Sequence, residues 1–362
     1  MFKYCVSYLI LGNSFVISTN SIELITNQVN HIAKFCYSVP SFKEVSDSNQ
    51  ILIEYYEDEQ LFLKYKTLIL ASNFKIISTF EKEKHAKALI GLETCFMQLP
   101  DKYIVRKITN KHYIVIGNSI KDTTKYVFRL IREIIVRIQE NKGKLFMHAT
   151  SLVVNDIGIS IVGNSGSGKT TYFSKLLSKG GASIISNDRT FFYFDNNTKM
   201  DYFPIPIVYK IGAVEHNFQL KKYILESDKY ILSGAFKEGN ESLPVPLTDV
   251  CNFFSETTSL ETSKLDMIIF SEIDFKNQYI FESRLLSKNE AIKIMLETCF
   301  TPIDRESLRK PWIYPRYKSD RQFEIDGRNL IEQIIDNVPI CFVRFGKDIS
   351  VDKLYFKTIN LI

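Results

Sequence analysis

The stretch GNSGSGKTT, residues 163–171, decides the fold class of this chain. Its spacing fits the phosphate-loop pattern G-x-x-x-x-G-K-[ST]. Glycines at positions 166 and 168 allow positive φ angles, so that successive backbone N–H groups converge on an anion. We expect nucleotide phosphates to bind along the whole loop: Gly163, Asn164, Ser165, Gly166, Ser167, Gly168, Lys169, Thr170 and Thr171.

Three residues of this loop have separate expected roles. Lys169 is placed to bridge the β- and γ-phosphates, and the Thr170 hydroxyl is placed to bind Mg²⁺. Thr171 either contacts phosphate or caps the following helix. The expected cofactors are therefore ATP and Mg²⁺, although the loop itself does not specify the base.

The sequence around the loop supplies the strands and helix that the motif requires. Two β-branched runs, 151–154 and 158–162, are separated by Asn155-Asp156, which predicts a hairpin. A helix with Phe173, Leu176 and Leu177 on one face follows the loop and ends at Gly180-Gly181. The run 182–186 then predicts another buried strand. Strand, loop, helix and strand in this order predict an α/β core.

Polar residues flank this core on both sides. Asp188 follows the strand 182–186, where a Walker-B-type carboxylate would bind the metal. Arg189 either contacts phosphate or pairs with Asp188, and the sequence leaves this open. His148 precedes the first strand; it is either a satisfied core histidine or a catalytic group.

The block from His148 to Arg189 resembles the catalytic core of the HPr kinase/phosphorylase family, whose fold is similar to that of phosphoenolpyruvate carboxykinase. The shared pattern is a histidine before two short strands, a G-x-S-G-x-G-K-[ST] loop, a helix, a small or glycine pair, and two acidic residues after the next strand. The resemblance implies a P-loop core on a mixed sheet. It also implies phosphoryl transfer, with His148 near the reacting phosphate.

The chain departs from that pattern at Asn187. In the bifunctional family members the first residue of the acidic pair is the base that activates the acceptor hydroxyl, and an amide does not take up a proton in this way. Either Asp188 takes both roles, or another acid such as Asp201 or Asp304 is brought in by folding. We expect a kinase without phosphorolysis, whose substrate is not HPr itself.

The composition excludes several other classes of protein. The 362 residues carry 46 basic and 41 acidic side chains, a formal net charge of +5, with both signs mixed along most of the chain. That balance gives no indication of a nucleic-acid partner. Six cysteines without a C-x-x-C pair favour a reducing cytoplasm. The sequence contains no run of about 18 apolar residues, so we expect no membrane span. Whether the protein forms a homo-oligomer is left open by the sequence.

The chain outside the core suggests two domains, a β-rich accessory domain over 1–140 and a catalytic domain over 141–362. The first domain should contain a strand-turn-strand at its start and hairpins across 57–59 and 109–111. A helix over 122–143 should join the domains and present its charges to solvent.

The C-terminal part offers further expectations. Ser287 and Glu290 predict a capping box at the start of a helix, and a helix at 328–337 with a strand at 340–345 should close the chain. The segment 215–245 is either a lid or a solvated insertion. Arginines near Trp312 are either surface residues or contacts for an anionic acceptor: Arg305, Arg309 and Arg316.

We therefore expect an ATP- and Mg²⁺-dependent kinase that transfers the γ-phosphoryl group to a hydroxyl of a small molecule or of a peptide serine. Two alternatives remain at this stage. One is a regulatory P-loop NTPase that couples hydrolysis to a partner. The other is a module that binds nucleotide without turnover.

Overall fold

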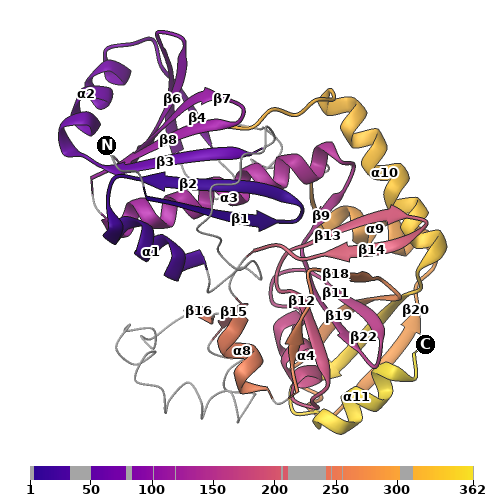
Figure 1. The fold of residues 1–362 in the computed structure, drawn as a ribbon. Helices are drawn as coiled ribbons and strands as arrows, with labels where there is room; N and C mark the ends of the chain where they lie inside the picture. The colour runs from indigo at the N-terminus through magenta and orange to yellow at the C-terminus, as the bar shows by residue number, and fades with distance from the viewer. Residues whose placement is uncertain are drawn as a thin grey trace. The chain divides into compact units, whose positions relative to one another are not determined.

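The computed structural model describes residues 4–32, 50–78, 84–100, 102–118, 120–204, 207–210, 242–245, 247–254, 256–301 and 313–361. The chain divides into two compact units (Figure 1). Unit 1 comprises the described residues of 1–142 and 304–319, and unit 2 comprises those of 143–303 and 320–362. Helices and mixed sheets occur in both units, so the chain is an α/β protein. No helix among the described residues is long and apolar enough to cross a membrane.

Unit 1 is built on one eight-stranded sheet. Its strands are β1 (Tyr4–Ile10), β2 (Asn13–Thr19), β3 (Ile51–Glu57), β4 (Lys75–Ser78), β5 (Lys84–Ile90), β6 (Glu93–Leu99), β7 (Tyr103–Thr109) and β8 (His112–Gly117). Their order is β1-β2-β3-β8-β7-β6-β5-β4, with parallel pairing at β2–β3 and β3–β8. The predicted hairpin at the start is confirmed, because Leu11 and Gly12 turn between β1 and β2 with φ of 49° and 70°. The hairpin across 109–111 is confirmed by the pairing of β7 with β8.

The predicted hairpin across 57–59 is wrong, because β3 is followed by helix α2 (Glu59–Leu70). Asp58 is the N-cap, and its side chain accepts a hydrogen bond from the Leu61 N–H at 2.8 Å. Phe62 and Ile69 of this helix are buried in a cluster with residues of β5 to β8. A capping aspartate and apolar residues seven positions apart favour a helix over a second strand. Another helix, α1 (Ile22–Ile32), follows β2.

Helix α3 (Ile120–Asn141) confirms the predicted helix, which ends just before Gly143. Its charges do not form a solvated face, so that prediction is wrong. Arg137 is only 1% exposed and pairs with Glu133 at 3.1 Å and with Glu140 at 2.8 Å. The side chains of 124–136 are mostly buried as well. Charges on a helix that is buried nearly all round must neutralise one another.

Unit 2 contains a seven-stranded mixed sheet that carries the glycine loop. Its strands are β10 (Ala149–Val154), β11 (Ile157–Val162), β12 (Ala182–Ser186), β17 (Thr258–Ser259), β19 (Met267–Asp274), β20 (Phe281–Leu285) and β22 (Ile340–Gly346). Their order is β17-β12-β10-β11-β19-β22-β20. The loop strand β11 pairs antiparallel with β10 and parallel with β19. The hairpin at Asn155-Asp156 is confirmed, with φ of 50° and 61°.

A second, five-stranded antiparallel sheet in unit 2 has the order β18-β14-β13-β9-β21. Its strands are β9 (Leu145–Met147), β13 (Thr190–Asp195), β14 (Asn197–Asp201), β18 (Thr262–Lys264) and β21 (Cys299–Thr301). Two further strands, β15 (Ile207–Lys210) and β16 (Ser242–Val245), pair with each other and are followed by helix α8 (Leu247–Phe253). The segment 215–245, which the sequence leaves open as either a lid or a solvated insertion, lies outside the described residues except for 242–245.

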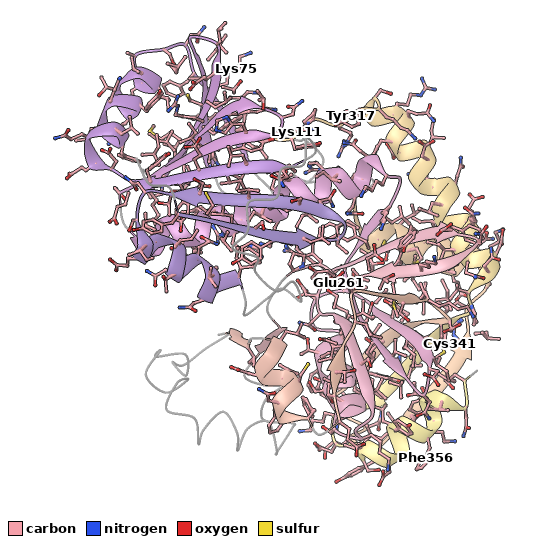
Figure 2. All side chains as sticks on the ribbon, in the orientation of Figure 1. Lys75, Lys111, Glu261, Tyr317, Cys341 and Phe356 are labelled. Atoms are coloured by element: carbon pink, nitrogen blue, oxygen red, sulfur yellow. The ribbon has the colours of Figure 1, made fainter. Side chains whose placement is uncertain are left out.

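Helix α4 (Lys169–Leu177) follows the glycine loop and packs on the seven-stranded sheet. Its Tyr172, Phe173, Leu176 and Leu177 share a buried cluster with β10, β11, β19 and β22. Helix α11 (Val351–Ile359) contacts α4, and the Tyr172 hydroxyl lies 2.6 Å from that of Thr358. In Figure 2, Cys341 marks β22, where it is buried, and Phe356 marks the exposed side of α11.

The remaining helices test the C-terminal predictions. Helix α9 (Lys288–Thr298) begins with the predicted capping box: Ser287 accepts from the Glu290 N–H, and Glu290 accepts from the Ser287 N–H. Helix α10 (Asp320–Asn337) confirms the predicted helix and starts eight residues earlier than 328. Strand β22 is confirmed, but α11 follows it, so the prediction that this strand closes the chain is wrong. Ser350 caps α11 by accepting from the Lys353 N–H.

Candidate active site

The glycine loop joins the end of β11 to the start of α4. Gly163, Gly166 and Gly168 have φ of 150°, 85° and 89°, and Gly168 is the N-cap of α4. Asn164, Ser165 and Gly166 are exposed, whereas Lys169 and Thr171 are buried and Thr170 is half-buried. The open side of the loop thus faces solvent at a helix N-terminus, where backbone N–H groups and the helix dipole favour an anion.

The floor of the loop leaves no room for a side chain at Gly168. A Cβ there would lie 2.8 Å from Ile273 Cβ of β19 and 2.8 Å from Phe345 Cζ of β22. A Cβ at Gly163 would lie 2.5 Å from the Ser167 hydroxyl, which is itself 3.4 Å from the Ser271 hydroxyl. The loop therefore rests directly on the carboxyl ends of the two parallel strands.

Lys169 folds back into the loop that precedes it. Its ammonium donates to the carbonyl oxygen of Gly163 at 2.7 Å and to that of Asn164 at 3.1 Å. The Ser167 N–H also donates to the Asn164 carbonyl, at 3.1 Å. These bonds hold the buried Lys169 ammonium against the inside of the loop, where it would attract an anionic ligand.

His148 and Asp188 meet because the chain changes sheets twice at the same place. His148 lies between β9 of the five-stranded sheet and β10 of the seven-stranded sheet, and residues 187–189 make the same change between β12 and β13. Met147 pairs with Thr190 on one side of this crossing, and Ser151 pairs with Ser186 on the other. Residues 148–150 are therefore brought opposite 187–189.

His148 and Asp188 form a hydrogen bond, with His148 Nε2 3.0 Å from Asp188 Oδ1. Arg189 Nε lies 3.6 Å from the other carboxylate oxygen of Asp188. Burial raises the pKa of Asp188, but the His148 hydrogen bond and the charges of Arg189, His148 and Lys169 outweigh it and lower this pKa from 3.8 to about 2. Asp188 is thus ionised at neutral pH, within electrostatic reach of the loop lysine.

Asp188 also has an unusual backbone. Its φ is 67°, in the left-handed region, which aspartate tolerates better than most residues other than glycine. Asn187, beside it, is 3% exposed, and its Oδ1 accepts a hydrogen bond from the Thr150 hydroxyl at 3.1 Å.

Thr150 was missed by sequence reasoning. Its hydroxyl accepts a hydrogen bond from the Asp188 N–H at 3.3 Å in addition to donating to Asn187. The available signal was a threonine two residues after His148, which in a β-strand is ordinary. Its partners Asn187 and Asp188 lie far away in the sequence and are brought next to it by the fold.

The other predicted residues have different partners or lie outside the described residues. Asp201, a candidate acid, forms an ion pair with Lys144. Arg316 belongs to unit 1, where its side chain is nearly buried and lies 3.4 Å from Glu140. Arg305 and Asp304 lie outside the described residues, as do Arg309 and Trp312.

Asp188 and Thr170 supply oxygen donors of the kind that bind Mg²⁺. Among the described residues, no group of three or more His, Cys, Asp or Glu side chains forms a metal cage. Mg²⁺ usually takes one or two carboxylates together with substrate phosphates and water. An ionised Asp188 and the Thr170 hydroxyl are donors of that kind, so the residues fit the ion.

Comparison with known proteins gives little further information. No family model matches the chain, and no curated protein matches it. Among solved structures, a similar chain is the Hpr(Ser) kinase/phosphatase from Coxiella burnetii, with 10% sequence identity and a TM-score of 0.26, covering 60% of this chain and 92% of that one. Because the TM-score is low, no property of that protein is assigned to this chain.

Proposed function

We propose that this protein is an ATP- and Mg²⁺-dependent kinase with an HPr kinase-like P-loop core. The observation that supports the proposal is the pairing of β10 with both β11 and β12, Ala149 opposite Val162 and Ser151 opposite Ser186. The glycine loop after β11 and Asp188 after β12 therefore follow the same edge of the sheet, which suits a site for phosphoryl transfer.

The roles of the residues follow from their contacts. Backbone N–H groups of 163–168 and the start of α4 bind the phosphates, and the Lys169 ammonium exchanges its two carbonyl partners for phosphate oxygens. Thr170 and Asp188 would hold Mg²⁺, which neutralises charge on the phosphates when bound. His148 orients Asp188 through their hydrogen bond.

The acceptor oxygen bonds to the γ-phosphorus as the bond from this phosphorus to the β–γ bridging oxygen breaks, ADP leaves, and the proton of the acceptor hydroxyl passes to the His148–Asp188 pair. The low pKa makes Asp188 a weak base. Phosphoryl transfer through a loose transition state depends mainly on positioning and charge neutralisation, so a weak base is sufficient. We propose a hydroxyl of a small molecule or of a peptide serine as the acceptor.

The test follows the γ-phosphate of labelled ATP in the presence of Mg²⁺ and a cell extract. Label on a discrete acceptor supports the kinase, release as inorganic phosphate that a partner accelerates supports a regulatory NTPase, and ATP binding without turnover supports a binding module. Lys169→Met should abolish transfer. Lys179→Met is the matched control, because Lys179 is a partly exposed lysine just beyond α4 that pairs with Asp352. Equal rates in the wild type and Lys169→Met would refute the proposal.

A further inference from the structure

The contacts of Thr150 connect strand β10 to the turn that carries Asp188. Its side chain is fully buried. Its hydroxyl donates to Asn187 Oδ1 at 3.1 Å and accepts from the Asp188 N–H at 3.3 Å. A hydroxyl has one proton to donate, so this single group fixes a side chain and a backbone group of adjacent residues.

The bond to Asn187 also sets the orientation of its amide. With Oδ1 accepting from Thr150, the side chain of Asn187 keeps its two N–H groups as donors for other partners. Residue 187 is then held as a hydrogen-bond donor, which agrees with the inability of an amide to act as a base.

The bond to Asp188 supports an unfavourable backbone conformation. Asp188 has φ of 67°, and its carboxylate reaches His148 Nε2 at 3.0 Å from that conformation. If the turn relaxed toward negative φ, the side chain would leave the backbone in another direction. The hydrogen bond from the Asp188 N–H to the Thr150 hydroxyl connects this turn to β10 and opposes that change.

We propose that Thr150 is a positioning residue of the phosphoryl-transfer site, whose hydroxyl holds the Asn187-Asp188 turn so that Asp188 meets His148. The expected change in transfer rate rests on the proposed kinase function. The hydrogen bond between His148 and Asp188 can be measured without turnover.

Ser151 provides a matched control on the same strand. It is also fully buried, and its hydroxyl lies 2.8 Å from the Ser160 hydroxyl and 2.9 Å from that of Thr190. Ser151→Ala therefore deletes a buried hydroxyl with two partners, as Thr150→Val does, without removing a bond to residue 187 or 188.

The kinetic test compares Thr150→Val, Thr150→Ser and Ser151→Ala with the wild type. Transfer of label from saturating γ-labelled ATP is measured in extract, and the dissociation constant of ATP is measured by calorimetry. Thr150→Val should slow transfer by about tenfold or more, because a small misplacement of a reacting group costs up to about a hundredfold. Thr150→Ser should restore the rate, Ser151→Ala should retain it, and ATP affinity should be unchanged in all three. A normal rate in Thr150→Val, or an equal loss in Ser151→Ala, would overturn the proposal.

The structural test separates this inference from the proposed function. Long-range ¹H–¹⁵N spectra at neutral pH report the tautomer and hydrogen bonding of each histidine ring, and His148→Gln identifies the His148 signals. Thr150→Val should shift these signals, whereas Thr150→Ser and Ser151→Ala should leave them in place. Unshifted signals in Thr150→Val would overturn the positioning role. If the wild type transfers no phosphoryl group but the signals shift as expected, the proposed function fails and the positioning role stands.

Discussion

Replacing Gly168 by alanine should destabilise unit 2 through two separate effects. Gly168 has φ of 89° at the N-cap of α4, a conformation that costs an L-residue about 1–2 kcal/mol. The added Cβ would also lie 2.8 Å from both Ile273 Cβ and Phe345 Cζ. Phe345 is fully buried and packs edge-on against Tyr172, with ring centroids 5.0 Å apart, so it has little room to move.

The magnitude follows by adding these effects. Overpacking of a well-packed core typically costs about 1–3 kcal/mol. Together with the backbone term of about 1–2 kcal/mol, Gly168→Ala should lower the free energy of unfolding by about 2–5 kcal/mol. Reduced freedom of the unfolded chain offsets about 0.4–1 kcal/mol of this loss, so the expected net loss is about 1–4.6 kcal/mol.

Gly166→Ala isolates the backbone effect. Gly166 has φ of 85°, almost the same as Gly168, but a Cβ there would meet nothing within 4 Å. Gly166→Ala should therefore lower the free energy of unfolding less than Gly168→Ala does, and the difference should equal the overpacking term, about 1–3 kcal/mol.

The assay is urea unfolding followed by far-UV circular dichroism, with the slope compared between variants. Phe345→Leu should lessen part of the penalty of Gly168→Ala in a double-mutant cycle, because it removes Phe345 Cζ while the contact with Ile273 Cβ remains. Equal losses in the two alanine variants would refute the reasoning, since the loop would then have moved off Ile273 and Phe345 at no cost.

Three further predictions concern other parts of the chain. The hydrogen bonds of Glu290 with Arg284 and Ser287 lower its folded pKa from 4.5 to about 2. The stability that these bonds contribute is therefore full above pH 4.5 and is lost as the pH falls through about 2. Glu290→Gln should make the free energy of unfolding depend less on pH over this range. Arg137→Met should lower the free energy of unfolding by about 3–5 kcal/mol in urea titrations, because it removes a buried charge from Glu133 and Glu140, and a neutral effect would show that water reaches these carboxylates. Asp58→Ala should cost about 1 kcal/mol in the same titrations through the lost cap of α2, whereas Asp58→Asn should cost less.

Local features were predictable from the sequence because their causes lie within a few residues. The turn at Asn155-Asp156 needs two residues that tolerate positive φ, and the sequence places them between two β-branched runs. The capping box of Ser287 and Glu290 is likewise complete within four positions. The glycine loop belongs to this group, since its spacing and flanking elements are contiguous.

Predictions failed where a local pattern suited two structures. Residues 59–65 contain apolar and aromatic residues that suit a strand, but packing of Phe62 and Ile69 under the sheet selects a helix. The charges of α3 look like a solvated face in the sequence, yet Arg137 is buried. Solvent exposure depends on which other elements cover a helix, and these come from elsewhere in the chain.

The sequence by itself determined the glycine loop, the strand and helix on either side of it, and the identity of the polar residues in the flanking turns. Only the tertiary structure decided that His148 meets Asp188 across 40 positions, that Thr150 holds the turn between them, and that Ile273 and Phe345 form the floor under Gly168. The physical reason is that hydrogen bonds within turns and caps act over a few residues. The crossing of the chain between two sheets, in contrast, results from many strand pairings made at long sequence separation.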